Sequence, residues 1–478
     1  MQAFDYFRDR AATQLAGQFD AALFQRLILQ ASHEHSAVLH ACLAVGFMYR
    51  AHGARSAKRP ITTIDTNSEH HRNALIEYGH AVAELRAWIS VVAKTEIALL
   101  VCILLVCFEM LQGRQEGATS HLTKGLAVLF GYLRPYARTA GRRFRPVSVS
   151  ATATKTLDIL LSTFVRLDYE ATLFTAHDPY LAASLPIDLS SDTASSALFD
   201  SVDEAKRHLD VLTSEILRYR SALLSHARLV YDEDGSLFAD WAHRYAVMSA
   251  ASRSVDHAYV HHQQEKLNSC LAAWSNAFEA TPGDPEDTAR LQLQMQCFYA
   301  RMLVTTMRET HECLLDRFES TFATIIGLAE RYITRHTGPD DSPTFNISPC
   351  VIPALYLIGM KCRASAIRRK AISLLRNIPF HEGWWQGAPF AVFLEQLADA
   401  EEQRARLLDT SNASLAHVSS MTCADIPEMA RYTDVVFAVD AVGALTRGRL
   451  VCARYAHESD GGLVLEEHRF IVARTAGP

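Results

Sequence analysis

The 478-residue chain has ten cysteines, and no two of them form a C-x2-C pair. Zinc sites made of thiolates use such close pairs, and a cluster of several metal ions needs more than one of them. The given residues therefore exclude a thiolate metal cluster. The cysteines are scattered through apolar surroundings, so we expect small buried side chains in an intracellular protein.

Positive charge is also scarce. Lys and Arg number 47 against 53 Asp and Glu, which gives a net charge of −6. A nucleic-acid-binding module is usually distinctly basic, so we expect no direct sequence-specific DNA contact from this chain. The first residues contain Asp5 and Asp9 and no apolar run, so we expect no secretory signal. A nuclear or cytoplasmic, intracellular location is predicted.

Recognised catalytic and nucleotide-binding patterns are missing as well. The sequence has no G-x-S-x-G elbow, no phosphate-binding G-x4-G-K-[ST] loop and no G-x-G-x-x-G fingerprint. We therefore predict no catalytic residue, no bound cofactor and no metal ligand. An enzyme is the less favoured interpretation at this stage.

What is present is a long apolar segment followed by a turn. Residues 97–108 are twelve consecutive apolar residues, and Glu109 ends the run. A bilayer span needs about 18–20 apolar residues, so this is a buried helix rather than a membrane anchor. Gly113 and Gly117 supply the break before a second periodic segment begins at Ala118. Residues 97–130 are thus predicted to form a buried helical hairpin.

Several patterns in this order resemble the fungus-specific transcription-factor domain, the helical regulatory region of fungal zinc-cluster regulators. They are LxCFExLxG at 105–113, AxxHLxxGL at 118–126, FVRLD at 164–168, KCR with IRRKAIxLL at 361–375, and HEGxW at 381–385. The resemblance extends from about Gln30 to the C-terminus. It implies a structural family signature at the following residues: Glu109, Gly113, His121, Gly125, Arg368, Arg369, Glu382, Gly383 and Trp385.

The resemblance implies a transcription-regulator-like protein, here without the family's zinc cluster. Such a chain is expected to act through other regulatory proteins, through itself as a homo-oligomer, or by sensing a small-molecule effector, plausibly in control of specialised metabolism. A start upstream of Met1 that carries the missing cluster is another reading. The alternative function is a helical fold recruited as a small-molecule-binding protein or an enzyme of cyclase or hydrolase type.

The predicted fold class is all-α, an irregular bundle or solenoid of packed helical hairpins with a small antiparallel β-tail. Residues 1–30 form a leader and first helix, 31–280 an N-terminal helical lobe, 281–432 a C-terminal helical lobe, and 433–478 the β-rich tail. The N-terminal lobe carries a basic loop at 134–155 and an acidic loop at 177–198. Residues 237–278 are predicted to be a very long helix, either continuous or broken once. A helix capped by Asp287 is expected to run towards Arg335.

Glu109 follows an apolar helix, and a buried carboxylate needs a partner. It could be a general acid or base, or a polar clasp paired with Arg114 or His121; we favour the clasp. Three other groups are weaker candidates. Arg142, Arg143 and Arg145 form a basic contact loop, a Trp pair at 384–385 could line a pocket or wedge two helices, and His257, His261 and Glu265 share one helix face that could bind a metal.

Overall fold

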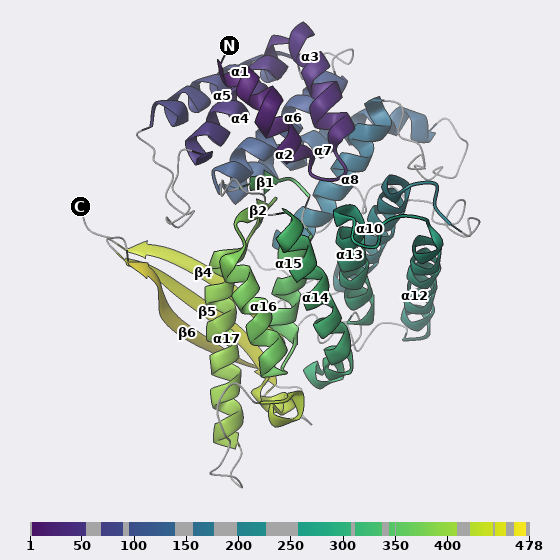
Figure 1. Cartoon of the computed structure of the whole chain (residues 1–478), viewed down its shortest axis with the longest axis vertical. Coiled ribbons are helices and arrows are strands. Elements are labelled where there is room, and N and C mark those ends of the chain that lie inside the picture. Colours follow the sequence, from purple (N-terminus) through teal and green to yellow (C-terminus); the bar gives the residue numbers. More distant parts are fainter. Residues whose placement is uncertain are drawn as a thin grey trace.

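The computed structural model confirms a predominantly helical chain and describes residues 2–53, 68–88, 95–138, 156–175, 198–225, 257–306, 311–336, 344–348, 350–408, 421–442, 445–455 and 463–474. The helices of the first half form the upper part of the molecule in Figure 1. Their bounds are α1 Gln2–Tyr6, a short π-helix Phe7–Ala11, α2 Ala12–Ala16, a second short π-helix Ala22–Leu27, α3 Ile28–Glu34, α4 Ser36–Gly53, α5 Glu69–Trp88, α6 Thr95–Leu111, α7 Gln115–Arg138 and α8 Thr156–Thr175.

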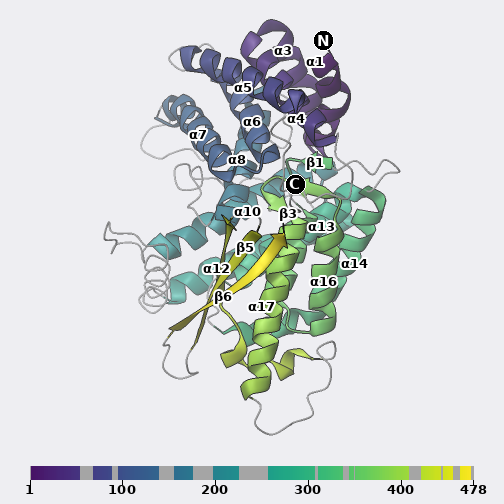
Figure 2. The same ribbon diagram turned by 90° about the vertical axis from the view of Figure 1, so that its left-hand side faces the viewer.

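The second half contributes the lower part and both sheets (Figures 1 and 2). Its helices are α10 Val202–Ser225, α12 His257–Ala280, α13 Thr288–Thr305, a 3-10 turn Glu312–Phe318, α14 Glu319–His336, α15 Val351–Lys361, α16 Ser365–Asn377, α17 Gly387–Leu408 and two 3-10 turns, Cys423–Asp425 and Glu428–Ala430. Its strands are β1 Thr344–Asn346, β2 Phe380–Glu382, β3 Trp385–Gln386, β4 Asp434–Val442, β5 Leu445–Tyr455 and β6 Leu463–Arg474.

The predicted hairpin of residues 97–130 is confirmed as α6 and α7. Every residue from Ala98 to Leu111 is buried, because α6 is apolar on all sides and lies at the centre of the upper helices. Gly113 ends the helix with a φ of 72°, a left-handed conformation in which glycine carries no steric penalty. The Arg114 amide donates to the Glu109 carbonyl at 2.9 Å, which closes the turn before α7.

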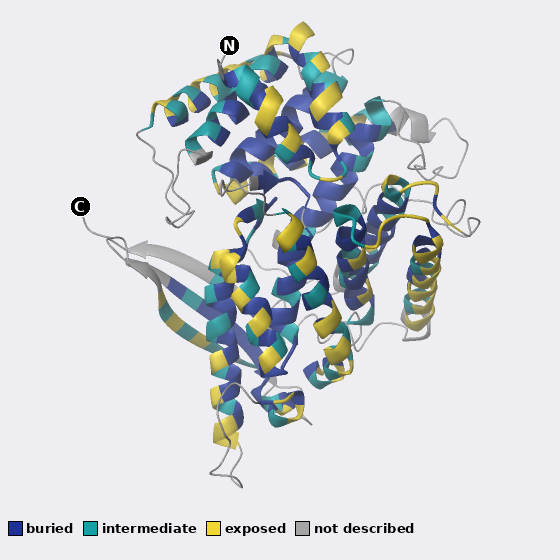
Figure 3. Cartoon of the chain, viewed as in Figure 1, coloured by how far each residue is buried: buried dark blue, intermediate teal, exposed yellow. Residues whose placement is uncertain are grey.

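One hydrophobic core joins the two halves of the chain. It runs from Phe7, after α1, to Cys452 on β5 and includes residues of α4, α6, α15 and α17. A second core cluster, with Leu209, Leu271 and Trp274, is made largely by α10, α12 and α13. Figure 3 shows the buried helix faces turned inward and the exposed faces outward. The upper helices therefore depend on the lower ones for part of their interior.

A small mixed sheet lies between the upper and lower helices (Figures 1 and 2). β1 pairs with β2 in parallel and β2 pairs with β3 antiparallel. The Tyr49 hydroxyl on α4 donates to the Phe345 carbonyl of β1 at 2.6 Å. β1 was not predicted from the sequence, because its partner β2 is far along the chain and local periodicity carries no signal for such a pair.

The predicted antiparallel β-tail is confirmed. β4 pairs with β5 and β5 with β6, in the order β4-β5-β6. One face lies on α17, where the ring of Phe393 stacks on Phe437 with 4.4 Å between centroids and meets Phe470 edge-on at 5.6 Å. A small sheet becomes stable when it has three or more strands with an apolar face or packs on a helix, and this sheet has three strands and packs on α17.

The single helix expected from Asp287 to Arg335 is wrong. Asp287 does cap a helix, since its carboxylate accepts from the Ala289 amide at 3.2 Å, but α13 ends at Thr305 and α14 begins at Glu319. The intervening 3-10 turn starts where the carboxylate of Glu428 accepts the amides of Glu312 and Cys313, each at 2.8 Å. A cap supplied from more than a hundred residues away cannot be read from local periodicity.

The basic loop predicted at 134–155 begins too early, because α7 continues to Arg138 beyond the buried Leu133. The rest of that loop, residues 139–155, lies outside the described residues. The same holds for almost all of the acidic loop 177–198 and for the helix predicted at 237–256. Within the described part of the chain, no helix is both long and apolar enough to cross a membrane.

Candidate functional site

Glu109, at the end of α6, is enclosed by α5 and α7. It is only 3 % exposed, and its carboxylate accepts a hydrogen bond of 2.7 Å from the Tyr78 hydroxyl on α5. The partners expected from the sequence lie farther away. Arg114 Nε is 3.8 Å from Oε2, and His121 Nε2 is 4.0 Å from Oε1. The sequence did not single out Tyr78, which comes from a different helix.

His121 on α7 completes this group, with Nε2 2.7 Å from the Tyr78 oxygen. Because the only hydroxyl proton of Tyr78 goes to Glu109, His121 must donate its Nε2–H. Burial, with a smaller contribution from Lys124, lowers the pKa of His121 to about 4. Burial and the bond to Glu109 raise the pKa of Tyr78. Neither His121 nor Tyr78 titrates near pH 7, where a general acid or base works best. The hydrogen bonds of this group instead join α5, α6 and α7.

Gly125 is the signature glycine that permits close helix packing, and Gly113 has room for a Cβ. A Cβ on Gly125 of α7 would lie 2.7 Å from Phe164 Cε1 and 3.3 Å from the Cβ of Cys102. Gly113 faces Gln386, whose Nε2 would be 3.9 Å from an added Cβ. Gly125 thus sets the distance between α7 and α8, and Phe164 is the first residue of the FVRLD pattern.

The second signature block forms a buried ionic framework. Arg368 is fully buried and donates to Glu401 on α17 at 2.7 Å and to the Gly359 carbonyl at 2.8 Å. Arg363 donates to the other Glu401 oxygen at 2.6 Å. Burial opposes ionisation of Glu401, but the two guanidinium groups outweigh it and hold its pKa at about 2. Arg369 pairs at the edge with Asp399 and Glu402, each at 2.7 Å.

Glu382 on β2 caps the start of α15. Its carboxylate accepts hydrogen bonds from three backbone amides, those of Cys350 at 2.9 Å, Val351 at 3.2 Å and Ile352 at 2.9 Å. Burial raises the pKa of Glu382 to about 7, and the three amides act in the opposite direction. Gly383 follows with a φ of 53°, and its amide donates to the Asn346 carbonyl of β1 at 2.9 Å. Trp385 then packs on Tyr356, with ring centroids 5.4 Å apart.

The α6–α7 turn and the β2–β3 hairpin meet at a small pocket. It is lined by Met110, Gly113 and Gln115 from the α6–α7 turn, and by Gly383, Trp384 and Gln386 from the β2–β3 hairpin. Its volume is about 10 Å³, which is room for a single water molecule. A ligand pocket usually measures about 300–1,000 Å³, so the tryptophan pair here acts as packing between the upper and lower helices.

Of the remaining predicted groups, the structure describes the side chains of His261 and Glu265 alone. His261 and Glu265 lie on α12 with Nδ1 to Oε2 at 3.3 Å, and their side chains are 56 % and 64 % exposed. His257 starts the same helix, but its side chain is outside the described residues, as are Arg142, Arg143 and Arg145. An exposed ion pair of this kind contributes little to stability.

A buried charged cluster that the sequence did not indicate lies between α8 and the segment around Asp20. Arg166, the central residue of FVRLD, donates to Asp20 at 2.9 Å and has its Nε 3.5 Å from Glu170. Glu170 is fully buried, and burial raises its pKa well above the ordinary value. Ser348, beside β1, donates to the second Asp20 oxygen at 3.1 Å. The cluster therefore ties the N-terminal segment to α8 and to the lower half.

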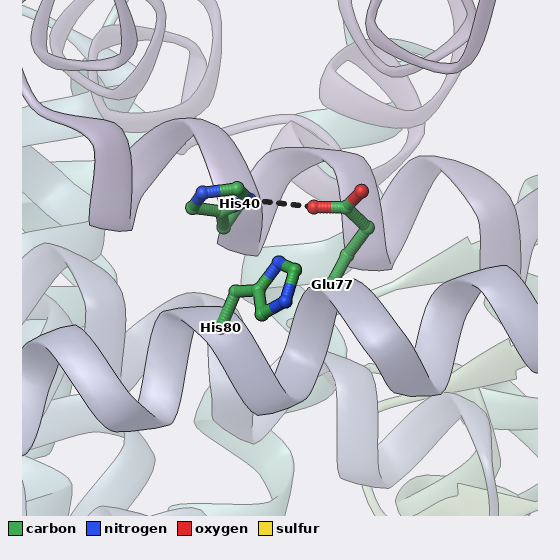
Figure 4. Close-up of side chains that lie close together, drawn as sticks. All are labelled: His40, Glu77 and His80. Carbon is green, nitrogen blue, oxygen red and sulfur yellow. Dashed lines mark hydrogen bonds and ion pairs between the residues drawn. The ribbon is translucent and has the colours of Figure 1, made fainter.

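A second group missed by the sequence reasoning lies between α4 and α5. Figure 4 shows His40 of α4 facing Glu77 and His80 of α5, and His40 Nδ1 is 2.6 Å from Glu77 Oε2. The rings of His40 and His80 are 5.0 Å apart at 73°. One ligand atom from each of the three residues lies within 4.8 Å of the others. The available signal was Glu77-x-x-His80, which puts a carboxylate and an imidazole on one helix face.

The comparison with protein families identifies the upper part of the chain. Residues 2–210 match the fungal specific transcription factor domain. No curated protein and no solved structure matches the chain. The match confirms the resemblance for the blocks at 105–126 and 164–168. The blocks at 361–375 and 381–385 lie beyond it, and their family origin stays a prediction.

Proposed function

We propose that this chain, whose residues 2–210 match the fungal specific transcription factor domain, regulates transcription through contact with another regulatory protein. The family match is the observation that carries the proposal. It supports a regulator-like role, and the choice of partner contact over direct DNA contact rests on the acidic balance of the chain and its lack of paired cysteines.

The geometry of the signature residues supports a scaffold role. Glu109, Arg368 and Glu382 are buried in contacts that join helices, and none of them opens onto the pocket between the halves. That pocket has room for one water molecule only. These features favour a rigid platform that presents outer surfaces to a partner. Control of specialised metabolism, and a metabolite that modulates the contact, are further parts of this proposal.

A tethering experiment tests the regulatory role. The full chain is fused to a heterologous DNA-binding domain and directed to a reporter promoter in fungal cells. We expect reporter expression to change several-fold relative to the DNA-binding domain alone. The matched control is the same fusion carrying Arg368→Ala, which breaks the buried pair with Glu401 and should lose the effect. A wild-type fusion that accumulates in the nucleus and leaves the reporter unchanged would contradict the proposal.

The metabolite arm is tested separately by thermal denaturation. Small molecules from specialised-metabolite pathways are added to the purified chain. A specific ligand should raise its melting temperature in a concentration-dependent way. No stabilisation by any compound would leave protein contact as the mode of regulation.

A further inference from the structure

The geometry points to a zinc site formed by His40, Glu77 and His80 between α4 and α5, a site independent of the regulatory role proposed above. Two imidazoles and one carboxylate are a set that Zn²⁺ accepts, with a water or another group in the fourth position. Imidazole nitrogen also suits the borderline character of zinc better than that of magnesium or calcium, which prefer oxygen ligands.

The spacing fits a zinc ion after small side-chain movements. Ligand atoms about 2.0–2.2 Å from a tetrahedral zinc lie about 3.4 Å from one another. Here the His40 Nδ1 to Glu77 Oε2 distance is 2.6 Å, and the ligand atoms of all three residues fall within 4.8 Å. Rotation of the side chains that moves the ligand atoms by about 1 Å is therefore enough to reach zinc geometry, and the two helices need not move.

The position of the two histidines also favours a cation between them. The two rings come from different helices and meet edge to face, with 5.0 Å between their centroids, and His40 contacts the Glu77 carboxylate (Figure 4). A metal ion would use the lone pairs of both rings and the charge of Glu77, and it would release the proton now shared between His40 and Glu77. An ion pair alone would use only one of the two rings.

A neighbouring carboxylate supports the site from outside. Glu84 Oε1 lies 3.8 Å from His40 Nε2, and its other oxygen accepts from the Ser36 hydroxyl at 2.5 Å. Carboxylates beside a ligating histidine orient its ring and raise its basicity. His40 and Glu77 are half-buried and His80 is exposed, so zinc can enter and leave from solvent. Zinc would then clamp α4 to α5.

The test is calorimetric titration of the chelator-treated full chain with zinc chloride. We expect one bound equivalent in the wild type and at least about a tenfold loss of affinity in both His40→Ala and His80→Ala, since even supporting residues outside the ligand set contribute about 10–100-fold. His80 is exposed, so His80→Ala should leave the fold intact. His261→Ala, which removes an exposed histidine of α12, should bind zinc like the wild type.

A second readout is the melting temperature. Zinc should raise it in the wild type and in His261→Ala but not in His80→Ala. The inference is overturned if the wild type binds no zinc, if His40→Ala and His80→Ala bind it as tightly as the wild type, or if His261→Ala is the variant that loses binding.

Discussion

Gly125 of α7 faces the ring of Phe164, a residue with no exposed surface, and the helix pair tolerates no side chain at that point. Tyr78 of α5 depends on its hydroxyl in the same way, since that group joins Glu109 to His121. Adding a Cβ at Gly125 or removing the hydroxyl of Tyr78 is therefore expected to lower the stability of the upper helices.

The first prediction concerns Gly125→Ala. The added Cβ would lie 2.7 Å from Phe164 Cε1, and the buried ring has nowhere to move, so the free energy of unfolding should fall by about 1–3 kcal/mol. Urea denaturation measures it. The control is Gly131→Ala on the same helix, where nothing lies within 4 Å of the added Cβ. That variant should gain about 0.4–1 kcal/mol, and equal effects of the two changes would contradict the packing argument.

The second prediction concerns Tyr78→Phe. Loss of the hydroxyl leaves the buried Glu109 carboxylate without its 2.7 Å hydrogen bond, so the free energy of unfolding should fall by about 1–3 kcal/mol in urea denaturation. Tyr6→Phe on α1 keeps its ring 5.8 Å from Arg50 and should stay within about 0.5 kcal/mol of the wild type. If Tyr78→Phe behaves like Tyr6→Phe, the clasp does not stabilise the fold.

At the scale of elements, buried charged groups join the lower helices in addition to apolar packing. Glu401 of α17 binds Arg363, which follows α15, and Arg368 of α16, and it also accepts the Tyr432 amide at 2.8 Å. The same carboxylate thus holds three helices and the segment that leads into the β-tail. Removing one member of a buried ionic group leaves the others without compensation.

The third prediction is a pH dependence centred on Glu401. Its pKa is about 2 in the folded chain against an ordinary value of 4.5. The folded state therefore binds fewer protons than the unfolded state in this interval. The resulting stability is complete above about pH 4.5 and is lost as the pH falls towards 2. Glu401→Gln should lower the free energy of unfolding at pH 7 by about 3–5 kcal/mol, and this difference should shrink as the pH falls.

The difference in free energy of unfolding between the wild type and Glu401→Gln, taken at each pH, isolates Glu401 from Glu382. The pKa of Glu382 is about 7 and acts on stability with the opposite sign. A raised carboxyl pKa favours folding at low pH, and that contribution is lost as the pH rises from about 4.5 through 7. Both proteins contain Glu382, so its effect cancels when their denaturation curves are compared at each pH. A difference that stays constant down to pH 2 would contradict the role given to Glu401.

For the whole molecule, the main core and the polar contacts cross between the two halves. Tyr49 of α4 binds β1, Asp20 is shared by Arg166 and Ser348, and Gly113 and Gly383 line the same small pocket. The family match ends at residue 210, but the interior of that region continues into later helices. The proposed division into lobes stays a prediction, and the contacts indicate that the halves fold together.

The fourth prediction follows from this shared interior. A fragment of residues 1–225 would lack β1 and the Trp384 region and would expose core surface. We expect it to have helical far-ultraviolet circular dichroism but a weak near-ultraviolet signal and strong binding of a hydrophobic dye. The full chain serves as the control. A fragment with fixed aromatic signals and a cooperative unfolding transition would show that the matched region folds on its own.

The sequence by itself determined the helical class, the hairpin at 97–130, the Asp287 cap and the β-tail. These features depend on periodicity, glycine conformation and turn residues, which act within a few positions of the chain. The resemblance to the family came instead from residue motifs, and the matched residues 2–210 contain the blocks at 105–126 and 164–168.

Only the tertiary structure decided which distant residues meet. Tyr78 reaches Glu109, Glu428 starts the turn before α14, β1 pairs with β2, and His40 faces Glu77. Each of these contacts depends on how distant segments of the chain pack together, and the residues at either end carry no mark of their partner. Burial then sets the chemistry: Glu401 and Glu382 are identical side chains, but two arginines lower the pKa of one, and an apolar site raises that of the other.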